Sequence, residues 1–374
     1  MKYVMLKDVC TINMGQSPDS NSYNDNGEGV PFFQGNADFG ERYPVTRKWC
    51  SAPTKMAVPE DILISVRAPI GAMNYAKEEC CIGRGLAALT PDKTKVSPEF
   101  IFWLLKGKNA ELNSKGTGST FKAIGKKVLE ETKVPYIPLE RQLEHSEILE
   151  KIYAVIQHRK SELQMLDRLI KVRFVEMFGN PIVNEKRWAV VELNSVCDGI
   201  GDGLHGTPEY DEKGGYPFIN GNNLMNGAIE ITPATKMVDE ATYKRHFIEL
   251  SNNAILLSIN GTLGKLAFYN GEEVMLGKSA CYCNLKPCIN RDFVYGVMKT
   301  DAFTGFLESN STASTIKNVG LKAIRGFMLI MPPEELQTRY VEFAKQVDKS
   351  KVAVQKTLEQ TQTLFNSLMQ KYFG

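Results

Sequence analysis

A stretch without proline or glycine organises this sequence: residues 334–373 read EELQTRYVEFAKQVDKSKVAVQKTLEQTQTLFNSLMQKYF. Its apolar residues recur at steps of mostly three and four, at Leu336, Tyr340, Phe343, Val347, Val354, Leu358, Phe365, Leu368 and Tyr372. This spacing is typical of the apolar seam of a coiled-coil helix. Pro332 and Pro333 come just before it, as a helix start allows. The pattern predicts a helix of about 40 residues, roughly 60 Å long at 1.5 Å per residue.

A second stretch of the same kind covers residues 139–178. It also lacks proline and glycine, and Gly179 follows it, where a helix C-terminus prefers glycine. Its spaced apolar residues are Ile148, Ile152, Val155, Ile156, Leu163, Leu166, Leu169, Ile170 and Met177. The two seams predict an antiparallel coiled coil of helices at 139–179 and 334–374. Two unconnected surface helices, each packed on its own domain, are the alternative.

The two halves of the chain repeat each other. Four blocks of the first half return in the same order, PFFQGN (31–36) as PFINGN (217–222), LISVRAPIG (63–71) as LLSINGTLG (256–264), STFK (119–122) as STIK (314–317), and FG (178–179) as FG (373–374). Chance similarity does not explain four ordered blocks. The repeat predicts two related domains, 1–138 and 180–333, each followed by one long helix.

Short apolar runs separated by Gly, Pro and Asn predict strands and turns within both domains. Residues 98–105 and 291–307 are helical patches among them. The predicted fold class is therefore α+β, with two tandem mixed α/β domains and two long helices.

Composition sets broad limits on function. The 374 residues are 43% hydrophobic and 24% charged, as in globular proteins, and the net charge is only +2. No apolar run approaches the ~18 residues of a membrane helix, and the first residues do not form a signal peptide. We expect a cytoplasmic protein. The eight cysteines lack C-x-x-C spacing, which favours reduced cysteines over a structural metal site.

Two similar heads on a rigid rod suit a ligand with two separated sites. Duplex DNA is such a ligand, since sites on one face recur every ~34–36 Å. Glycans or paired protein epitopes fit this geometry equally well.

Three segments carry a family resemblance: PYIPLERQ (135–142), MPPEELQ (331–337) and RFVEMFGNP (173–181). With the tandem domain–helix order, they make the chain similar to the specificity subunit of type I restriction–modification systems. The resemblance implies two target-recognition domains, a split double-stranded DNA target and no catalysis. It also implies two modification subunits docked on the helices, which methylate adenine with S-adenosylmethionine. Restriction subunits, where present, supply ATP- and Mg-dependent translocation and cleavage.

Charge agrees with an adaptor that depends on partners. Residues 1–138 carry 18 Lys and Arg against 15 Asp and Glu, whereas residues 181–332 carry 14 against 16. Affinity that is independent of base sequence grows with the number of phosphates neutralised. We therefore expect weak DNA binding by this chain alone.

Two polar loops that recur in both halves are candidates for DNA contact. They read GTGSTFK (116–122) and STASTIK (311–317). Hydroxyls, backbone donors and a lysine placed close together suit a phosphate, although a solvated turn is the alternative. The candidates in and beside these loops are Lys115, Thr117, Ser119, Thr120, Lys122, Ser314, Thr315 and Lys317.

Other candidates lie in the remaining repeated blocks. Amide side chains can pair bidentately with adenine edges, or can serve turn chemistry, at Gln34, Asn36, Asn220, Asn222 and Asn223. Arg67 aligns with Asn260 and Arg84 with Lys278, and such differences are expected of heads that read different half-sites. Arg67 can bind guanine or pair with a carboxylate. His205 lies in a glycine-flanked loop and is either a DNA contact or a solvent-exposed histidine.

Catalytic motifs are incomplete. GEEVMLGKS (271–279) places five residues between its glycines where a P-loop has four. NPIV (180–183) lacks the second proline and the aromatic residue of an adenine methyltransferase motif. A self-contained DNA methyltransferase or nuclease, and a two-headed protein- or glycan-binding scaffold, are the alternative functions.

Overall fold

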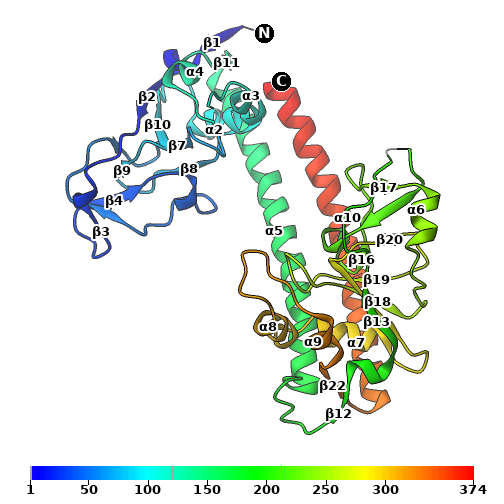
Figure 1. Cartoon of the computed structure of the whole chain (residues 1–374). Coiled ribbons are helices and arrows are strands. Elements are labelled where there is room, and N and C mark those ends of the chain that lie inside the picture. The colour runs from blue at the N-terminus through cyan, green and yellow to red at the C-terminus, as the bar shows by residue number, and fades with distance from the viewer. Residues whose placement is uncertain (1, 119–121, 212) are drawn as a thin grey trace. The chain divides into compact units, whose positions relative to one another are not determined.

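The computed structural model describes all residues except 1, 119–121 and 212 (Figure 1). The chain forms two compact units, one from residues 1–160 with 355–374 and the other from residues 161–354. Each unit therefore holds one globular head and parts of both long helices.

The two long helices are present as predicted. Helix α5 spans Leu139–Phe178 and helix α10 spans Glu334–Phe373, each with 40 residues. In unit 1 the His145 ring of α5 stacks on Tyr372 of α10, with centroids 3.8 Å apart. Further along α5, the Tyr153 ring lies 6.1 Å from the ring of Phe365. A later residue of α5 thus contacts an earlier residue of α10, as in an antiparallel pair of helices.

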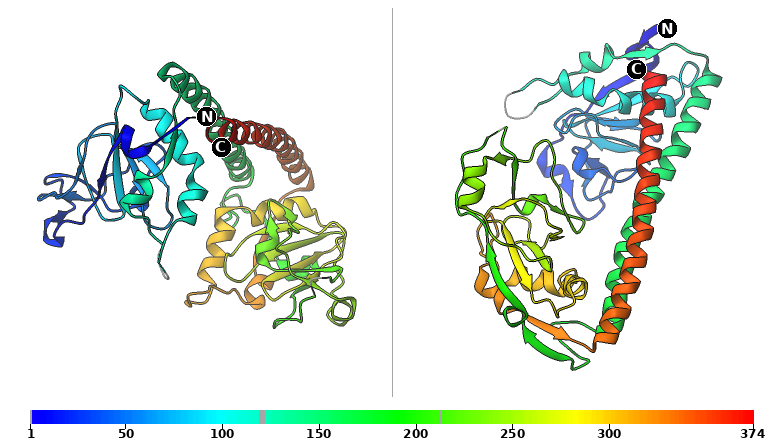
Figure 2. Two further views of the ribbon diagram at one scale, coloured as in Figure 1. Left: turned by 90° about the horizontal axis from the view of Figure 1, so that it is seen from above. Right: turned by 90° about the vertical axis from the view of Figure 1, so that its right-hand side faces the viewer.

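Unit 2 continues the same antiparallel pairing. Lys351 forms a 2.7 Å ion pair with Asp167, and the Phe174 and Tyr340 rings lie 5.3 Å apart. The helices lie side by side in the right-hand view of Figure 2. Packing of α5 against α10 within each unit excludes the alternative of two unconnected surface helices.

The predicted seam is accurate on α10 and wrong at two positions on α5. All nine spaced residues of α10 are buried or half-buried. On α5, however, Val155 and Leu169 are each 44% exposed, whereas Leu149 and Phe174 are fully buried. Helix α5 carries apolar residues on more than one face, so their spacing alone does not identify the face that packs.

The heads share one antiparallel sheet order. In unit 1 it is β2-β10-β7-β8, formed by Cys10–Met14, Leu86–Pro91, Ile62–Ser65 and Met73–Tyr75. In unit 2 it is β13-β21-β18-β19, formed by Cys197–Asp202, Ala280–Leu285, Ala254–Ser258 and Leu266–Phe268. The matching order extends the sequence repeat to the level of topology.

A parallel strand pair also repeats. Strand β4 (Val30–Phe33) runs parallel to β9 (Cys80–Ile82), and β14 (Tyr216–Ile219) runs parallel to β20 (Met275–Leu276). Two-stranded sheets β1-β11 (Tyr3–Met5, Lys133–Pro135) and β12-β22 (Ala189–Glu192, Met328–Met331) correspond likewise. Shorter strands complete the heads: β3 (Tyr23–Asn24), β5 (Trp49–Cys50), β6 (Met56–Ala57), β15 (Leu224–Met225), β16 (Ala228–Ile229) and β17 (Met237–Val238).

Short helices pack on the sheets. They are α1 (Leu6–Val9), α2 (Pro98–Gly107), α3 (Asn109–Ser114), α4 (Lys126–Glu130), α6 (Glu240–Arg245), α7 (Arg291–Met298), α8 (Asp301–Ser309) and α9 (Leu321–Arg325). The predicted patch 291–307 is thus two helices. Thr300 separates them, because its hydroxyl accepts the Phe303 N–H (3.3 Å) and donates to the Val297 carbonyl (2.7 Å). A threonine N-cap of this kind starts a new helix.

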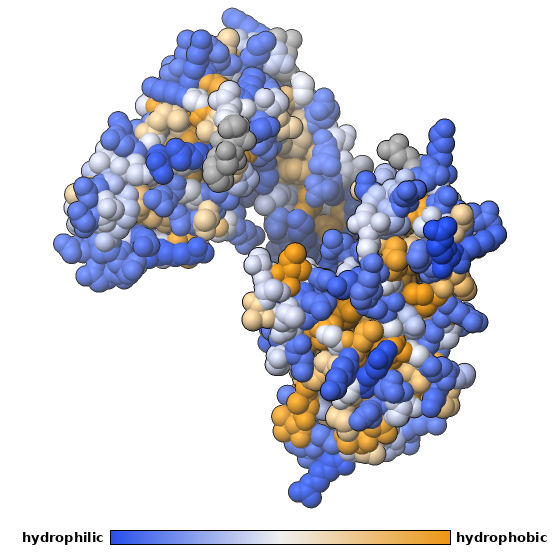
Figure 3. Space-filling model, viewed as in Figure 1, coloured by the Kyte–Doolittle hydropathy of each residue, from blue (hydrophilic) through white to orange (hydrophobic). Residues whose placement is uncertain are grey.

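Apolar residues that stay exposed are scattered over both units. In Figure 3 hydrophilic residues prevail on the visible face, and apolar residues gather in several patches on unit 2. Within the described part of the chain, no helix has both the length and the apolar character to cross a membrane.

The end of α10 completes the core of the first head. Phe365, Tyr372 and Phe373 are buried with the aromatic residues of α2. The ring of Phe365 lies 5.6 Å from Trp103, and that of Phe373 lies 5.2 Å from Phe100. The last residues of the chain therefore stabilise a domain built by the first ones.

We expect Phe365→Ala to destabilise unit 1 by about 3–5 kcal/mol, because it leaves a cavity among buried rings. Its neighbour Leu364 is 51% exposed, so Leu364→Ala is the matched control and should cost less than about 1 kcal/mol. Hydrogen exchange in increasing urea, read on peptides from each unit, measures both. Equal effects of the two variants would contradict this packing.

His145 gives this core a dependence on pH. Its Nδ1 is buried and has no hydrogen-bond partner among the described residues. Burial, followed by the charge of Arg141, lowers the pKa of the imidazole below its usual 6.5. The unfolded chain then binds protons that the folded chain does not, so stability falls as the pH drops below about 6.5.

We expect His145→Phe, which retains a ring against Tyr372, to lose less stability than the wild type between pH 7 and pH 5. His158 lies exposed on the same helix, so His158→Phe serves as the control. Thermal unfolding across that pH range measures the effect. An unchanged pH dependence in His145→Phe would rule out the assigned role.

Candidate nucleic-acid interface

In unit 2 several loops meet at the carboxyl ends of the strands. Because β14 and β20 run parallel, with Ile219 opposite Leu276, the residues that follow them emerge at one edge. Gly277 donates its N–H to the Ile219 carbonyl (2.8 Å), which places Asn220 beside the 277–279 loop. The loop after β13 joins them, since the Leu204 N–H donates to the Leu276 carbonyl (2.8 Å).

These loops enclose a pocket of about 430 Å³. Four of the predicted site residues line it: Asn220, Asn222, Asn260 and Lys278. They lie up to 58 residues apart in the chain, at positions that align with residues of the first half. The pocket is thus polar, carries one positive charge and faces solvent.

Unit 1 builds the corresponding edge from the first copy of each block. Phe33 lies opposite Ile82 in the parallel pair, and Gly83 donates its N–H to the Phe33 carbonyl (2.8 Å). Gln34 and Arg84 follow, and both are exposed. The edges also share a bond across the loops, from Val66 N–H to the Gly85 carbonyl (2.9 Å) in unit 1 and from Ile259 N–H to the Ser279 carbonyl (3.1 Å) in unit 2.

The loops that end at Lys122 and Lys317 join the same edges. The Lys122 carbonyl accepts the Ala68 N–H (3.0 Å), and the Lys317 carbonyl accepts the Gly261 N–H (2.9 Å). Arg67 and Thr117 both bridge to Ala123, which brings these two predicted residues together. Ser119 and Thr120 lie outside the described residues.

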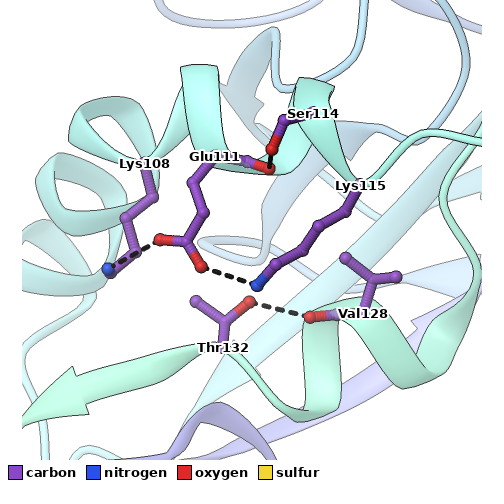
Figure 4. Close-up of polar contacts among 6 residues, drawn as sticks. All are labelled: Lys108, Glu111, Ser114, Lys115, Val128 and Thr132. Carbon is purple, nitrogen blue, oxygen red and sulfur yellow. Dashed lines mark hydrogen bonds and ion pairs between the residues drawn. The ribbon is translucent and has the colours of Figure 1, made fainter.

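Several predicted residues already have partners within the protein. In Figure 4, Glu111 of α3 lies between Lys108 and Lys115, with its oxygens 3.0 and 2.6 Å from their ammonium groups. The Lys115 ammonium, and then that of Lys108, lower the pKa of the Glu111 carboxyl. A phosphate has to compete with that carboxylate for Lys115.

In unit 2 the Lys317 ammonium lies 3.7 Å from Glu308, and the His205 ring nitrogen lies 2.9 Å from an Asp202 oxygen. Lys317 and Glu308 are both exposed, and exposed ion pairs are worth little, so Lys317 exchanges this partner easily for an anion. The His205 side chain is exposed as well, whereas that of Asp202 is only 15% exposed.

Asn223 and Ser314 hold their own loops. Asn223 accepts the Asn220 N–H (3.0 Å) and donates to the Glu230 carbonyl (3.0 Å). The Ser314 hydroxyl donates to the Ile316 carbonyl (2.6 Å), while the Thr315 side chain is exposed. The amide atoms of Asn223 thus serve the loop, as the turn alternative anticipates. Asn36 stands at the equivalent turn of unit 1, half-buried at the start of Asn36–Asp38.

Sequence reasoning missed part of the pocket wall. Thr207, Tyr210 and Ser279 line it as well, and the Lys236 ammonium lies 5.7 Å above the Tyr210 ring. Thr207 and Tyr210 lie in a loop without a repeated motif. Ser279 could have been found from the sequence. The segment IGRG (82–85) aligns with LGKS (276–279), so Ser279 corresponds to Gly85 in the repeat.

The segment that resembles a P-loop has another structure. A P-loop runs from a strand into a helix. Here residues 277–279 connect β20 to another strand, β21, and form part of the pocket instead. Among the residues that the structure describes, no group of three or more His, Cys, Asp or Glu side chains is placed to hold a metal ion.

Comparison with known proteins assigns the chain to a family. Residues 1–166 and 185–362 each match the family described as type I restriction modification DNA specificity domain. The chain belongs to this family. The two matched segments cover the first repeated head and nearly all of the second, so the resemblance read from the sequence is confirmed.

The relatives are specificity subunits. The chain is 45% identical over 160 residues to a candidate type I restriction enzyme MjaX specificity subunit of Methanocaldococcus jannaschii, a match that covers 43% of this chain and 38% of that protein. It is 19% identical to the type I restriction enzyme EcoBI specificity subunit of Escherichia coli, over 99% of this chain and 85% of that one. Both relatives carry the name of specificity subunits, which agrees with the family that the two matched segments show.

A solved structure has the same fold. The type I restriction–modification S subunit from M. genitalium matches with a TM-score of 0.57 at 14% identity, covering 100% of this chain and 96% of that one. The likeness confirms the fold class of two mixed α/β heads with long helices.

Proposed function

We propose that this chain recognises a bipartite DNA target and directs adenine methylation by partner subunits. Residues 1–138 and 180–333 are its two target-recognition domains. The observation that carries the proposal is the duplicated loop edge, in which one backbone frame presents different side chains. Arg67 and Asn260 occupy equivalent positions in it, as do Arg84 and Lys278. A shared backbone frame with different polar groups suits two different short DNA sequences, which we call words.

The partners follow from the same proposal. Two modification subunits, which use S-adenosylmethionine, bind the long helices, and restriction subunits with ATP and Mg²⁺ join where the system has them. Exposed apolar residues on α5 support docking there, since Met165, Leu169, Val172 and Val175 are 44–65% exposed. Exposed apolar stripes of this kind mark interaction sites. A system acting on chromosomal DNA places the chain in the cytoplasm.

The central experiment combines the chain with its two modification subunits, labelled S-adenosylmethionine and DNA of random sequence. Methylated adenines are then mapped by sequencing. The proposal requires two short words at a fixed gap, and no transfer by this chain alone. Transfer by the isolated chain would favour a self-contained methyltransferase, and methylation without a paired word would favour a scaffold.

We expect Asn36→Ala and Asn222→Ala to relax one base each, in different words. The two residues stand at equivalent turns, and an amide that pairs with a base edge contributes ~1–3 kcal/mol of discrimination. Words enriched from random DNA by each variant complex measure the change. Each variant serves as the control for the other, and a change in both words from one substitution would show that the heads do not read independently.

A second prediction concerns spacing. Inserting four residues, about one helical turn, after both Lys160 and Val354 should change the gap and leave both words intact. An insertion in one helix alone shifts one seam against the other, so it should impair the complex and serves as the control. Mapping methylated adenines measures the gap, and altered words after the double insertion would refute the spacer role.

A further inference from the structure

The pocket of unit 2 holds one amide side chain in a fixed orientation. The Ser279 hydroxyl oxygen accepts the Gly221 N–H at 2.9 Å and donates its proton to the Asn220 Oδ1, also at 2.9 Å. A hydroxyl has a single proton, and this arrangement satisfies all three groups. The amide oxygen of Asn220 is therefore turned toward Ser279, and its NH₂ group, on the other side of the amide, is the part presented to a ligand.

Close packing restricts this amide further. A Cβ added to Gly277 would lie 2.4 Å from the Asn220 Oδ1, so only glycine leaves room for it. The backbone N–H of Asn220 is held by the Asn223 side chain at 3.0 Å. The residue is thus fixed through its backbone, its amide oxygen and the space around it.

The chemistry of the pocket follows from this arrangement. Adenine offers a donor and an acceptor in the major groove, and bidentate pairing with it requires both atoms of a free amide. Asn220 presents its donor because Ser279 holds its oxygen on the other side, and its pocket neighbour Lys278 is only a donor. Guanine offers two acceptors, N7 and O6, on the same edge. Asn220 and Lys278 together therefore complement guanine better than adenine.

The first head lacks this device. Gly85 stands where Ser279 stands, as the matching bonds to Val66 and Ile259 show. A Cβ on Gly85 would lie 2.3 Å from the Gln34 carbonyl oxygen, so the position admits no hydroxyl-bearing side chain. Gln34 is exposed and has no serine at this position to fix its amide.

We propose that Ser279 is a positioning residue that makes Asn220 a hydrogen-bond donor and so selects guanine at one position of the word read by unit 2. The inference rests on the proposed function and assigns one specificity determinant within it. Its signature is a change at a single base of a single word.

The test uses the chain in complex with its modification subunits and a library of DNA targets. Ser279→Ala removes the bond that fixes the orientation of the Asn220 amide, and we expect the preference for guanine over adenine at that position to fall about tenfold. Ser279→Thr retains the hydroxyl and should retain the preference. The word read by unit 1 stays unchanged in both variants and serves as the internal control.

A second variant gives an independent readout. Asn220→Asp replaces the donor with an acceptor, so guanine preference should disappear at the same position. Asn220→Asp tests the inference even if Ser279→Ala does not fold.

Three results would overturn the inference: an unchanged word in Ser279→Ala, loss of the preference in Ser279→Thr to the same extent, or no guanine at any position affected by Asn220→Asp. Failure of the proposed function looks different, because the wild-type complex would then enrich no paired words at all.

Discussion

Antiparallel packing of α5 against α10 is the constraint on which both units depend. Each unit contains the beginning of one long helix and the end of the other, and unit 1 joins residues 1–160 to residues 355–374, on either side of the continuous unit 2. The core of unit 1 closes only when Phe365 and Tyr372, from the last helical turns, meet Trp103 and His145. Such long-range contacts make the spacer helices part of the domains that they connect.

The two heads share one backbone frame but differ in the side chains that it presents, and this difference links the architecture to recognition. Both heads bring the ends of equivalent strands to one polar edge through equivalent backbone bonds, such as Gly83 to Phe33 and Gly277 to Ile219. Backbone bonds of this kind do not depend on the side chains that the loops present. A duplicated domain can therefore change what it reads while it keeps its fold.

Much of the site followed from comparing the two halves of the sequence. The structure brings Asn220, Asn260 and Lys278, which all stand at aligned positions of the repeat, to the lining of one pocket. Thr207 and Tyr210 were missed because their loop has no repeated pattern. Nor could spacing reveal that Lys115 pairs with Glu111, since many exposed lysines have a carboxylate four residues away without bonding to it.

The amino-acid sequence by itself determined the two long helices, the duplication, the α+β class and the family. Helix length and seam spacing are properties of neighbouring residues, and a repeat is visible wherever it occurs. Only the tertiary structure decided which face of α5 is buried, that the last residues complete the first head, and that Ser279 holds the amide of Asn220. Those features depend on contacts between residues far apart in sequence, whose geometry is set by packing rather than by local pattern.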